Sequence, residues 1–161
     1  MAGNVLPHML TFLLCCVLSI FSAHSQCQSG WREYENKCYF FSTDTKSWFE
    51  ANEFCLEGGN LASIHTQEEE EFLALYSKGT TKWIGYSWSD GTPLSHTNWG
   101  DGEPNNHEGR EDCVEMVSNA NGTYSLWNDL NCDAHQDWIC KITKGKDPIL
   151  PPEPPSPEPG N

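Results

Sequence analysis

The sequence is poor in basic residues. Lysine and arginine total 9, against 23 aspartates and glutamates, and the formal net charge is −14. An acidic surface of this kind repels nucleic-acid phosphates and anionic lipid headgroups, so we expect neither nucleic-acid binding nor adsorption to membranes. The same carboxylates suit a hard cation such as calcium, although most of them simply keep the protein soluble.

Apolar runs long enough to cross a bilayer are also missing. The longest, Met9–Phe21, falls short of the roughly 20 residues that a membrane-spanning helix needs. It is followed by Ala23-His24-Ser25, whose small residues are typical of a signal peptidase site. We therefore interpret residues 1–25 as a signal peptide and expect a secreted, extracellular protein whose mature chain does not insert into a membrane. An uncleaved signal anchor is the alternative, because residues 1–8 carry no lysine or arginine.

Zinc-binding and catalytic patterns are absent as well. The chain has 8 cysteines but no Cys-x-x-Cys pair, and it has no Ser-His or Cys-His nucleophile pattern. We expect the protein not to be an enzyme. Two cysteines lie in the leader, and the even number that follows predicts a disulfide framework whose pairing the spacing alone leaves open. These cysteines are Cys27, Cys38, Cys55, Cys113, Cys132 and Cys140.

The first half of the mature chain shows hairpin and helix signals. Residues 27–41 alternate aromatic and polar residues around a Glu35-Asn36 turn, which predicts a hairpin. Ser47 with Glu50 is typical of a capping box, and the helix it begins should end before Gly58-Gly59. A brief strand is expected over residues 60–64.

A second helix is expected to begin after Thr66, which with Glu69 forms another capping pair. The run Glu68–Glu71 then falls in its first turn, where acidic side chains favour the positive end of the helix dipole. We interpret this run as a solvated turn without a further role.

The second half, residues 82–144, has short β-like segments separated by glycine, asparagine and proline. Helices followed by strands and loops predict an α+β domain over residues 26–144. Residues 145–161 are rich in proline and should form an extended tail or linker. Asn121-Gly122-Thr123 is a glycosylation sequon in an expected turn, so we predict a glycan at Asn121.

Side chains with oxygen atoms are concentrated between residues 102 and 129, in the combination of carboxylates and amides that calcium prefers. No EF-hand loop accounts for them. An ordinary acidic surface loop is the alternative interpretation, and a glycoside hydrolase using Glu103 and Glu111 is a further one. The residues are Glu103, Asn105, Asn106, Glu108, Glu111, Asp112, Asn128 and Asp129.

Residues 27–144 resemble the C-type lectin-like family, and in particular its mannose-type members, such as the sugar-binding domains of the macrophage mannose receptor and single-domain secreted lectins. The resemblance rests on seven motifs in order. They are Trp48-Phe49-Glu50-Ala51, Leu61-Ala62-Ser63-Ile64, Trp83-Ile84-Gly85, Glu103-Pro104-Asn105, Glu111-Asp112-Cys113, Trp127-Asn128-Asp129 and Trp138-Ile139-Cys140. It implies two helices, short antiparallel sheets, a long calcium-binding loop region and the disulfides Cys27–Cys38, Cys55–Cys140 and Cys113–Cys132.

The resemblance also implies a Ca²⁺ site and calcium-dependent sugar binding. The family's principal calcium ligands match Glu103, Asn105, Glu111, Asn128 and Asp129, which would bind the sugar as well, and Pro104 matches its cis-proline. The order Glu-Pro-Asn implies mannose, N-acetylglucosamine or fucose, presented as mannose-type glycans on microbial or host surfaces in innate defence. His107 resembles a residue that touches sugar in some members, and a plain surface histidine is the alternative.

One segment departs from the family pattern. Relatives usually have about ten more residues between the strand at Trp83-Ile84-Gly85 and the segment Trp88-Ser89-Asp90-Gly91, and that loop supplies acids for a second calcium ion. We therefore expect one principal ion. A single sugar bound at one site should bind weakly. We therefore expect an oligomer, in which several sites bind one glycan surface together and strengthen the binding. A lectin-like domain that binds a protein or another surface without calcium or sugar is the alternative function.

Overall fold

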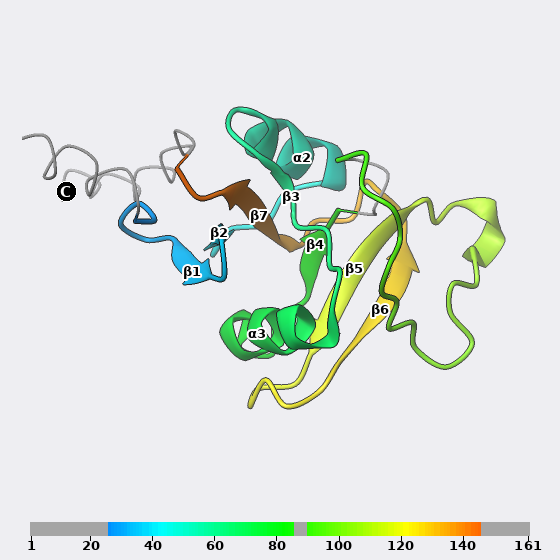
Figure 1. Ribbon diagram of the computed structural model, residues 1–161. Coiled ribbons are helices and arrows are strands. Elements are labelled where there is room, and N and C mark those ends of the chain that lie inside the picture. The colour runs from blue at the N-terminus through cyan, green and yellow to red at the C-terminus, as the bar shows by residue number, and fades with distance from the viewer. Residues whose placement is uncertain (1–25, 86–89, 146–161) are drawn as a thin grey trace, which may run out of the picture.

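The computed structural model describes residues 26–85 and 90–145. The predicted signal peptide, residues 1–25, and all but the first residue of the proline-rich tail lie outside the described residues. Among the described residues, no helix has the length and apolar character needed to cross a membrane. The described residues between Cys27 and Gly145 form one α+β unit (Figure 1).

The predicted hairpin is present. Strand β1 (Arg32–Tyr34) pairs with β2 (Lys37–Phe41), and the register places Tyr34 opposite Lys37 across the Glu35-Asn36 turn. Glu35 has a φ of 51°, which a tight two-residue turn requires.

Both predicted helices form, each with its predicted N-cap. Helix α2 (Trp48–Leu56) carries the complete capping box, in which Ser47 accepts from the Glu50 amide and Glu50 accepts from the Ser47 amide. Helix α3 (Gln67–Ser77) has the Thr66 side chain accepting from the Glu69 amide at 3.1 Å. The strand expected over residues 60–64 is only Asn60–Leu61, β3, because the ladder pairing with β7 covers these two residues.

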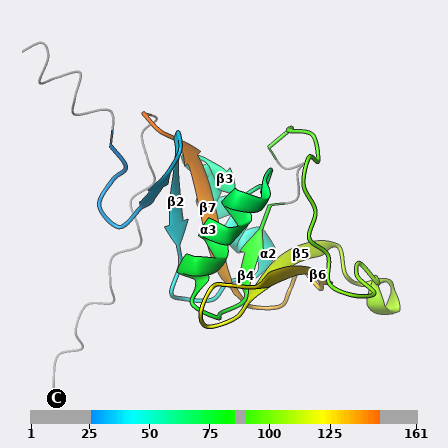
Figure 2. The same ribbon diagram turned by 60° about the horizontal axis from the view of Figure 1, so that its bottom comes forward.

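The remaining strands complete a sheet around β7. They are β4 (Lys82–Ile84), β5 (Cys113–Ser118), β6 (Ser125–Leu130) and β7 (Asp137–Thr143). The order is β1-β2-β7-β4-β5-β6, with β3 also pairing with β7. All pairs are antiparallel except β4 with β7, which is parallel. The β5–β6 hairpin extends away from the rest of the sheet (Figures 1 and 2).

Two apolar clusters lie on either side of β7, one under each helix. Ala51 of α2 packs with Trp138 of β7, and Leu73 of α3 packs with Ile139. Successive residues of a strand point to opposite faces, so β7 contributes to both clusters. Figure 1 shows the strands running between α2 and α3. The core therefore fixes both helices against the strand that ends the domain.

The three disulfides form with the pairing that the resemblance implied. Cys27 is bonded to Cys38 and Cys113 to Cys132, with sequence separations of 11 and 19 residues. The third, Cys55–Cys140, joins α2 to β7 across 85 residues, and both of its cysteines are fully buried.

The prediction of a solvated acidic run is wrong for Glu69 and Glu70. Their exposed fractions are 6% and 0%. Both precede buried α3 residues by four positions, Leu73 and Ala74 respectively, and positions four apart share a helix face. The burial is tolerated because each carboxylate is fully engaged in hydrogen bonds or an ion pair.

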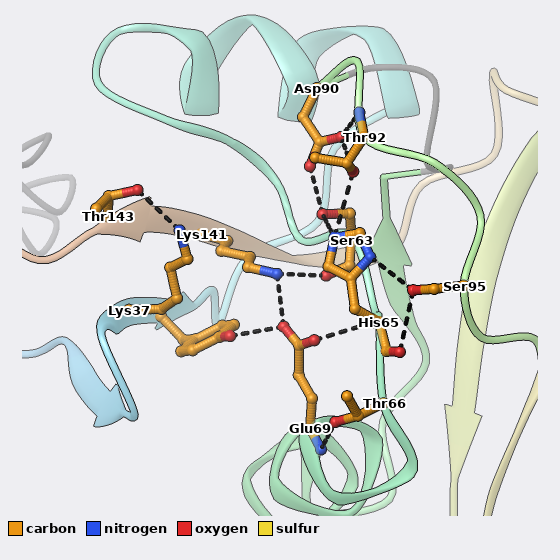
Figure 3. Close-up of polar contacts among 11 residues, drawn as sticks. Lys37, Ser63, His65, Thr66, Glu69, Asp90, Thr92, Ser95, Lys141 and Thr143 are labelled. Atoms are coloured by element: carbon orange, nitrogen blue, oxygen red, sulfur yellow. Dashed lines mark hydrogen bonds and ion pairs between the residues drawn. The ribbon is translucent and has the colours of Figure 1, made fainter.

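Glu69 is the centre of one polar network (Figure 3). Its Oε1 accepts from the Tyr39 hydroxyl and from Lys141 Nζ, each at 2.6 Å, and its Oε2 accepts from the His65 amide at 2.9 Å. Burial, followed by the nearby Glu69 charge, raises the pKa of Tyr39 well above its usual range. This network ties α3 to strands β2 and β7.

Candidate functional site

The loop that leads from β4 to β5 carries most of the predicted site and is held along β6. Trp127 donates its backbone N–H to Asn98 O at 2.7 Å, and Gly100 donates to Trp127 O at 2.9 Å. The Trp99 and Trp127 rings meet edge to face, with their centroids 5.7 Å apart. The loop thus runs alongside β6 immediately before Asn128 and Asp129.

Asp129 joins the two motifs that define the predicted site. Its exposed fraction is 4%, and its Oδ1 and Oδ2 accept from the backbone amides of Asn105 at 3.0 Å and Asn106 at 2.7 Å. Burial alone would raise the pKa of Asp129, but the hydrogen bonds from Asn106 and Asn105 outweigh it and lower that pKa. Asp129 is therefore an anion at neutral pH that fixes the position of the Glu103-Pro104-Asn105 segment.

Glu103 and Asn105 lie side by side across a cis peptide bond between Glu103 and Pro104. Asn105 donates its side-chain amide to Glu103 Oε1 at 2.9 Å and its backbone amide to Glu103 Oε2 at 3.2 Å. Both side chains are at the surface, where solutes can reach them.

Glu111 closes the same loop from its other end. Its Oε2 accepts from the His107 amide at 2.9 Å, and its own amide donates to Asn106 Oδ1 at 3.2 Å. A short 3-10 turn, η1 (His107–Gly109), lies between them, and Glu108 within it has a φ of 55°. Residues 103–111 therefore fold back on themselves, so that Glu103, Asn105 and Glu111 lie in one loop segment, which is anchored to Asp129 of β6.

Asn128 is placed differently from the other four predicted ligands. Its side-chain amide donates to Glu115 Oε1 at 2.9 Å, and Gln136 donates to the other oxygen of Glu115 at 2.9 Å. Within the described residues, no hydrogen bond joins Asn128 to Glu103, Glu111 or the other predicted ligands. The cause is strand register, because Asn128 faces Glu115 across the β5–β6 pair whereas Asp129 faces Val114.

Glu115 contacts the predicted ligand Asn128, and the sequence analysis did not single it out. Its exposed fraction is 6%, and burial raises its pKa despite the hydrogen bonds from Asn128 and Gln136. Its signal in the sequence is weak: an acidic residue within a segment of otherwise apolar β-like residues.

His107 is a surface residue at the tip of the loop. Its side chain is 75% exposed, and Nε2 lies 3.9 Å from Glu108 Oε1. Its backbone amide donates to Glu111, and contact of its ring with a sugar stays a prediction. Asn121 is exposed in the turn between β5 and β6, at the opposite end of that hairpin from Asp129, and its glycosylation stays a prediction.

Calcium is supported by the chemistry of this donor set, although the ligands are not gathered around a common point. Three carboxylates, those of Glu103, Glu111 and Asp129, and the amide oxygens of Asn105 and Asn128 are the donor types that calcium takes. In the part of the chain that the structure describes, no three His, Cys, Asp or Glu side chains converge as a metal cluster. The carboxylates of Glu103, Glu111 and Asp129 instead accept hydrogen bonds from N–H groups. These N–H groups approach the carboxylate oxygens with positive charge foremost, as a cation would.

The base of the loop is held by α3 through Glu70. The carboxylate of Glu70 accepts from Asn98 Nδ2 at 2.7 Å and from the Ser125 hydroxyl at 2.8 Å, and its other oxygen lies 2.5 Å from His96 Nε2. These partners come from the loop and from β6. One buried carboxylate thus joins the helix α3, the loop and β6, the strand that carries Asp129.

A second polar cluster holds the beginning of the described loop (Figure 3). Asp90 accepts hydrogen bonds from Ser63 Oγ and from the hydroxyl and backbone amide of Thr92. His65 contacts the Ser63 hydroxyl at 3.0 Å and the Ser95 hydroxyl at 3.2 Å. The loop is therefore anchored at two places, around Asp90 and around Asn98, before it reaches Glu103.

Replacing Asp90 with alanine is expected to destabilise the protein by about 1–2 kcal/mol at pH 7, because its three donors lose a charged acceptor. Burial raises the pKa of Asp90, but hydrogen bonds from Ser63 and Thr92 lower it below the usual 3.8. A lowered pKa in the folded state stabilises the protein above the unfolded pKa, and this contribution is lost as pH falls through the folded value. Urea denaturation should therefore show the difference from wild type narrowing below pH 3.8. An equal difference at pH 7 and pH 2.5 would contradict the assignment.

Comparison with known proteins identifies the domain. The family model for the lectin C-type domain matches residues 44–142. Lactose-binding lectin l-2 of Anguilla japonica is 40% identical over 132 residues, which cover 72% of this chain and 78% of the eel protein. The low affinity immunoglobulin epsilon Fc receptor of Mus musculus is 33% identical over 126 residues, and the match spans only 37% of that receptor.

A solved structure agrees with these matches. The C-type lectin domain of murine dendritic cell inhibitory receptor 2, determined in complex with an N-glycan, superposes with a TM-score of 0.66 at 30% identity, covering 74% of this chain and all of that one. Proteins of this family are carbohydrate-binding and not enzymes. With helices α2 and α3, the sheet and the disulfides described above, the chain belongs to the C-type lectin domain family.

Proposed function

We propose that this protein is a secreted, calcium-dependent lectin that binds mannose-type sugars. The observation that supports the proposal is the pair of hydrogen bonds that Asp129 of β6 accepts from the backbone amides of residues 105 and 106. These bonds hold the loop segment that carries Glu103, Asn105 and Glu111 against Asp129. Family membership supports carbohydrate binding in general. The predicted signal peptide, residues 1–25, supports secretion.

Calcium would be held by Glu103, Asn105, Glu111, Asn128 and Asp129, and when bound it would supply a positive centre that accepts lone pairs from sugar hydroxyls. Glu103 and Glu111 would exchange their present N–H partners for this role. Each carboxylate oxygen of Asp129 accepts one hydrogen bond in the structure and keeps a second lone pair. The anchor and the ligand role of Asp129 are therefore compatible.

The sugar would be recognised by side chains that already serve the ion. Each of two vicinal hydroxyls would give one lone pair to calcium, donate its proton to a carboxylate such as Glu103 or Glu111, and accept a proton from an asparagine amide. This would use the one donor and both lone pairs of each hydroxyl. The Nδ2 of Asn105, now bonded to Glu103, becomes such a donor once Glu103 turns to the ion. The Asn128 amide would do the same after leaving Glu115.

The proposal is tested by binding to immobilised mannan and to a glycan panel, with calcium and with a chelator. Binding should require calcium, and the chelator should elute the protein. Glu108→Gln is the matched control, because Glu108 is an exposed acid of the same loop outside the ligand set and should leave binding unchanged. Retention on mannan in the chelator would overturn calcium dependence, and failure to bind any glycan would overturn the lectin proposal.

Sugar selectivity is tested by exchanging Glu103→Gln together with Asn105→Asp. The order of acid and amide decides which hydroxyls are offered acceptors and donors, so the exchange should shift preference from mannose towards galactose by on the order of tenfold. The ratio of half-inhibitory concentrations of the two monosaccharides measures it. The eel relative is named for lactose, a galactoside, and a wild-type preference for galactose would contradict the mannose proposal.

A second candidate function is recognition of a protein without sugar. It is favoured by the placement of Asn128, whose amide is bonded to Glu115 and not to the loop, and by the match to a receptor named for an immunoglobulin. In the glycan experiment this function predicts no binding under either condition.

A further inference from the structure

A hollow with mostly apolar walls lies directly beside the proposed calcium site. Its volume is about 610 Å³, within the range of roughly 300–1,000 Å³ usual for small-molecule sites. Its apolar walls come from two elements, α2 and the loop that carries the site, together with the start of β5. They are formed by Trp48, Phe49, Trp99, Pro104 and Val114.

This hollow is continuous with the sugar site. Glu111 and Asp129, two of the predicted calcium ligands, line its rim, and Pro104 stands between the other two ligands of the loop, Glu103 and Asn105. A group attached to a sugar bound at these residues therefore meets the apolar walls within the length of a short chain.

The walls are held in place by contacts that do not involve a ligand. Trp48 donates its ring N–H to Ile84 O at 3.1 Å and its backbone amide to Cys132 O at 2.9 Å. Val114 follows Cys113, whose disulfide to Cys132 closes the same side. A preformed wall binds a ligand without first paying an ordering entropy, which favours affinity.

Phe49 completes the wall on α2 and is left largely uncovered. Its exposed fraction is 61%, the largest of the exposed apolar side chains in the described residues, and its ring meets Trp48 edge to face at 5.6 Å. An apolar side chain of this size at the edge of a preformed hollow is typical of a binding surface.

We propose that this hollow binds the aglycone of a glycoside, so that the physiological ligands are sugars linked to an apolar group, such as an alkyl or aryl chain. This inference rests on the proposed function, because the sugar is what brings the chain to the hollow. Sugar and chain are then bound together, with the calcium site fixing the sugar and the apolar walls removing the chain from water.

The test compares methyl and hexyl α-mannoside as competitors for immobilised mannan in the presence of calcium. Burial of the longer chain should make the hexyl glycoside about tenfold stronger than the methyl glycoside. Phe49→Ser should reduce that advantage to about threefold or less and leave the methyl glycoside unchanged. Leu75→Ser is the matched control, because Leu75 is 53% exposed on α3, away from the hollow, and should keep the full advantage.

Other outcomes separate this inference from the function on which it rests. Equal inhibition by the two glycosides, or an advantage that survives Phe49→Ser, would overturn the aglycone site and leave the lectin intact. Binding of the hexyl glycoside in a chelator would show that the apolar chain binds independently of the sugar, which contradicts a joint site. Failure of both glycosides to compete, with no binding of the protein to mannan, would overturn the proposed function itself.

Discussion

Replacing Asp129 with asparagine is expected to weaken calcium-dependent sugar binding by on the order of 100-fold, because one change removes both a calcium ligand and the anchor of the loop. An asparagine at this position turns an N–H₂ group towards the amide of residue 105 or 106. Two donors then face each other where a carboxylate now accepts both. The Glu103-Pro104-Asn105 segment loses the contact that fixes it to β6.

The loss of the anchor is measurable without calcium. In a chelator, the variant should be less stable than the wild type by about 1–2 kcal/mol, because the two amides lose a charged acceptor. Asp101→Asn is the control, since Asp101 is an exposed acid of the same loop. If Asp129→Asn loses sugar binding but has wild-type stability in the chelator, the anchoring role is wrong and only the ligand role stands.

Replacing Cys55 and Cys140 with alanine should cost the most stability, about 4–5 kcal/mol in the free energy of unfolding. A disulfide restricts the unfolded chain more strongly the longer the loop it closes, and this one closes 85 residues. The total stability of a small domain is only about 5–15 kcal/mol. The variant should therefore be close to unfolded at physiological temperature.

The matched control is the pair Cys27→Ala and Cys38→Ala. That disulfide closes 11 residues, and its loss should cost about 3 kcal/mol. Urea denaturation followed by tryptophan fluorescence gives both values. Equal losses of free energy would show that loop length does not decide how much each disulfide stabilises the protein.

Local features of the fold could be predicted from the sequence because their causes lie within a few residues. The Glu35-Asn36 turn and the Ser47–Glu50 capping box each depend on neighbours in the chain, and both form as expected. The disulfide pairing was not available from spacing, and it came from the resemblance to the family. The β3 strand is shorter than expected because its length depends on β7, which lies some eighty residues away.

What could not be predicted depends on partners far away in the sequence. The first turn of α3 looks like a solvated acidic run, yet Lys141 lies 72 residues from Glu69 and Ser125 lies 55 residues from Glu70. The placement of Asn128 opposite Glu115 follows from the register of two strands, which no local pattern fixes. For the site itself, counting oxygen-bearing residues indicated calcium chemistry, and the resemblance selected which residues serve as ligands.

The bonds that Asp129 accepts have a consequence for how new specificities could arise in this domain. Both donors are main-chain N–H groups, at positions 105 and 106, and every amino acid except proline has one. A change of side chain at position 105 therefore keeps both main-chain bonds. Asn106 should be kept, because its φ is 44° and its side-chain oxygen accepts from the Glu111 amide. Libraries that vary the acid and amide pair at residues 103 and 105 while keeping Asn106 and Asp129 should yield folded variants with altered sugar preference more often than libraries that randomise Asp129.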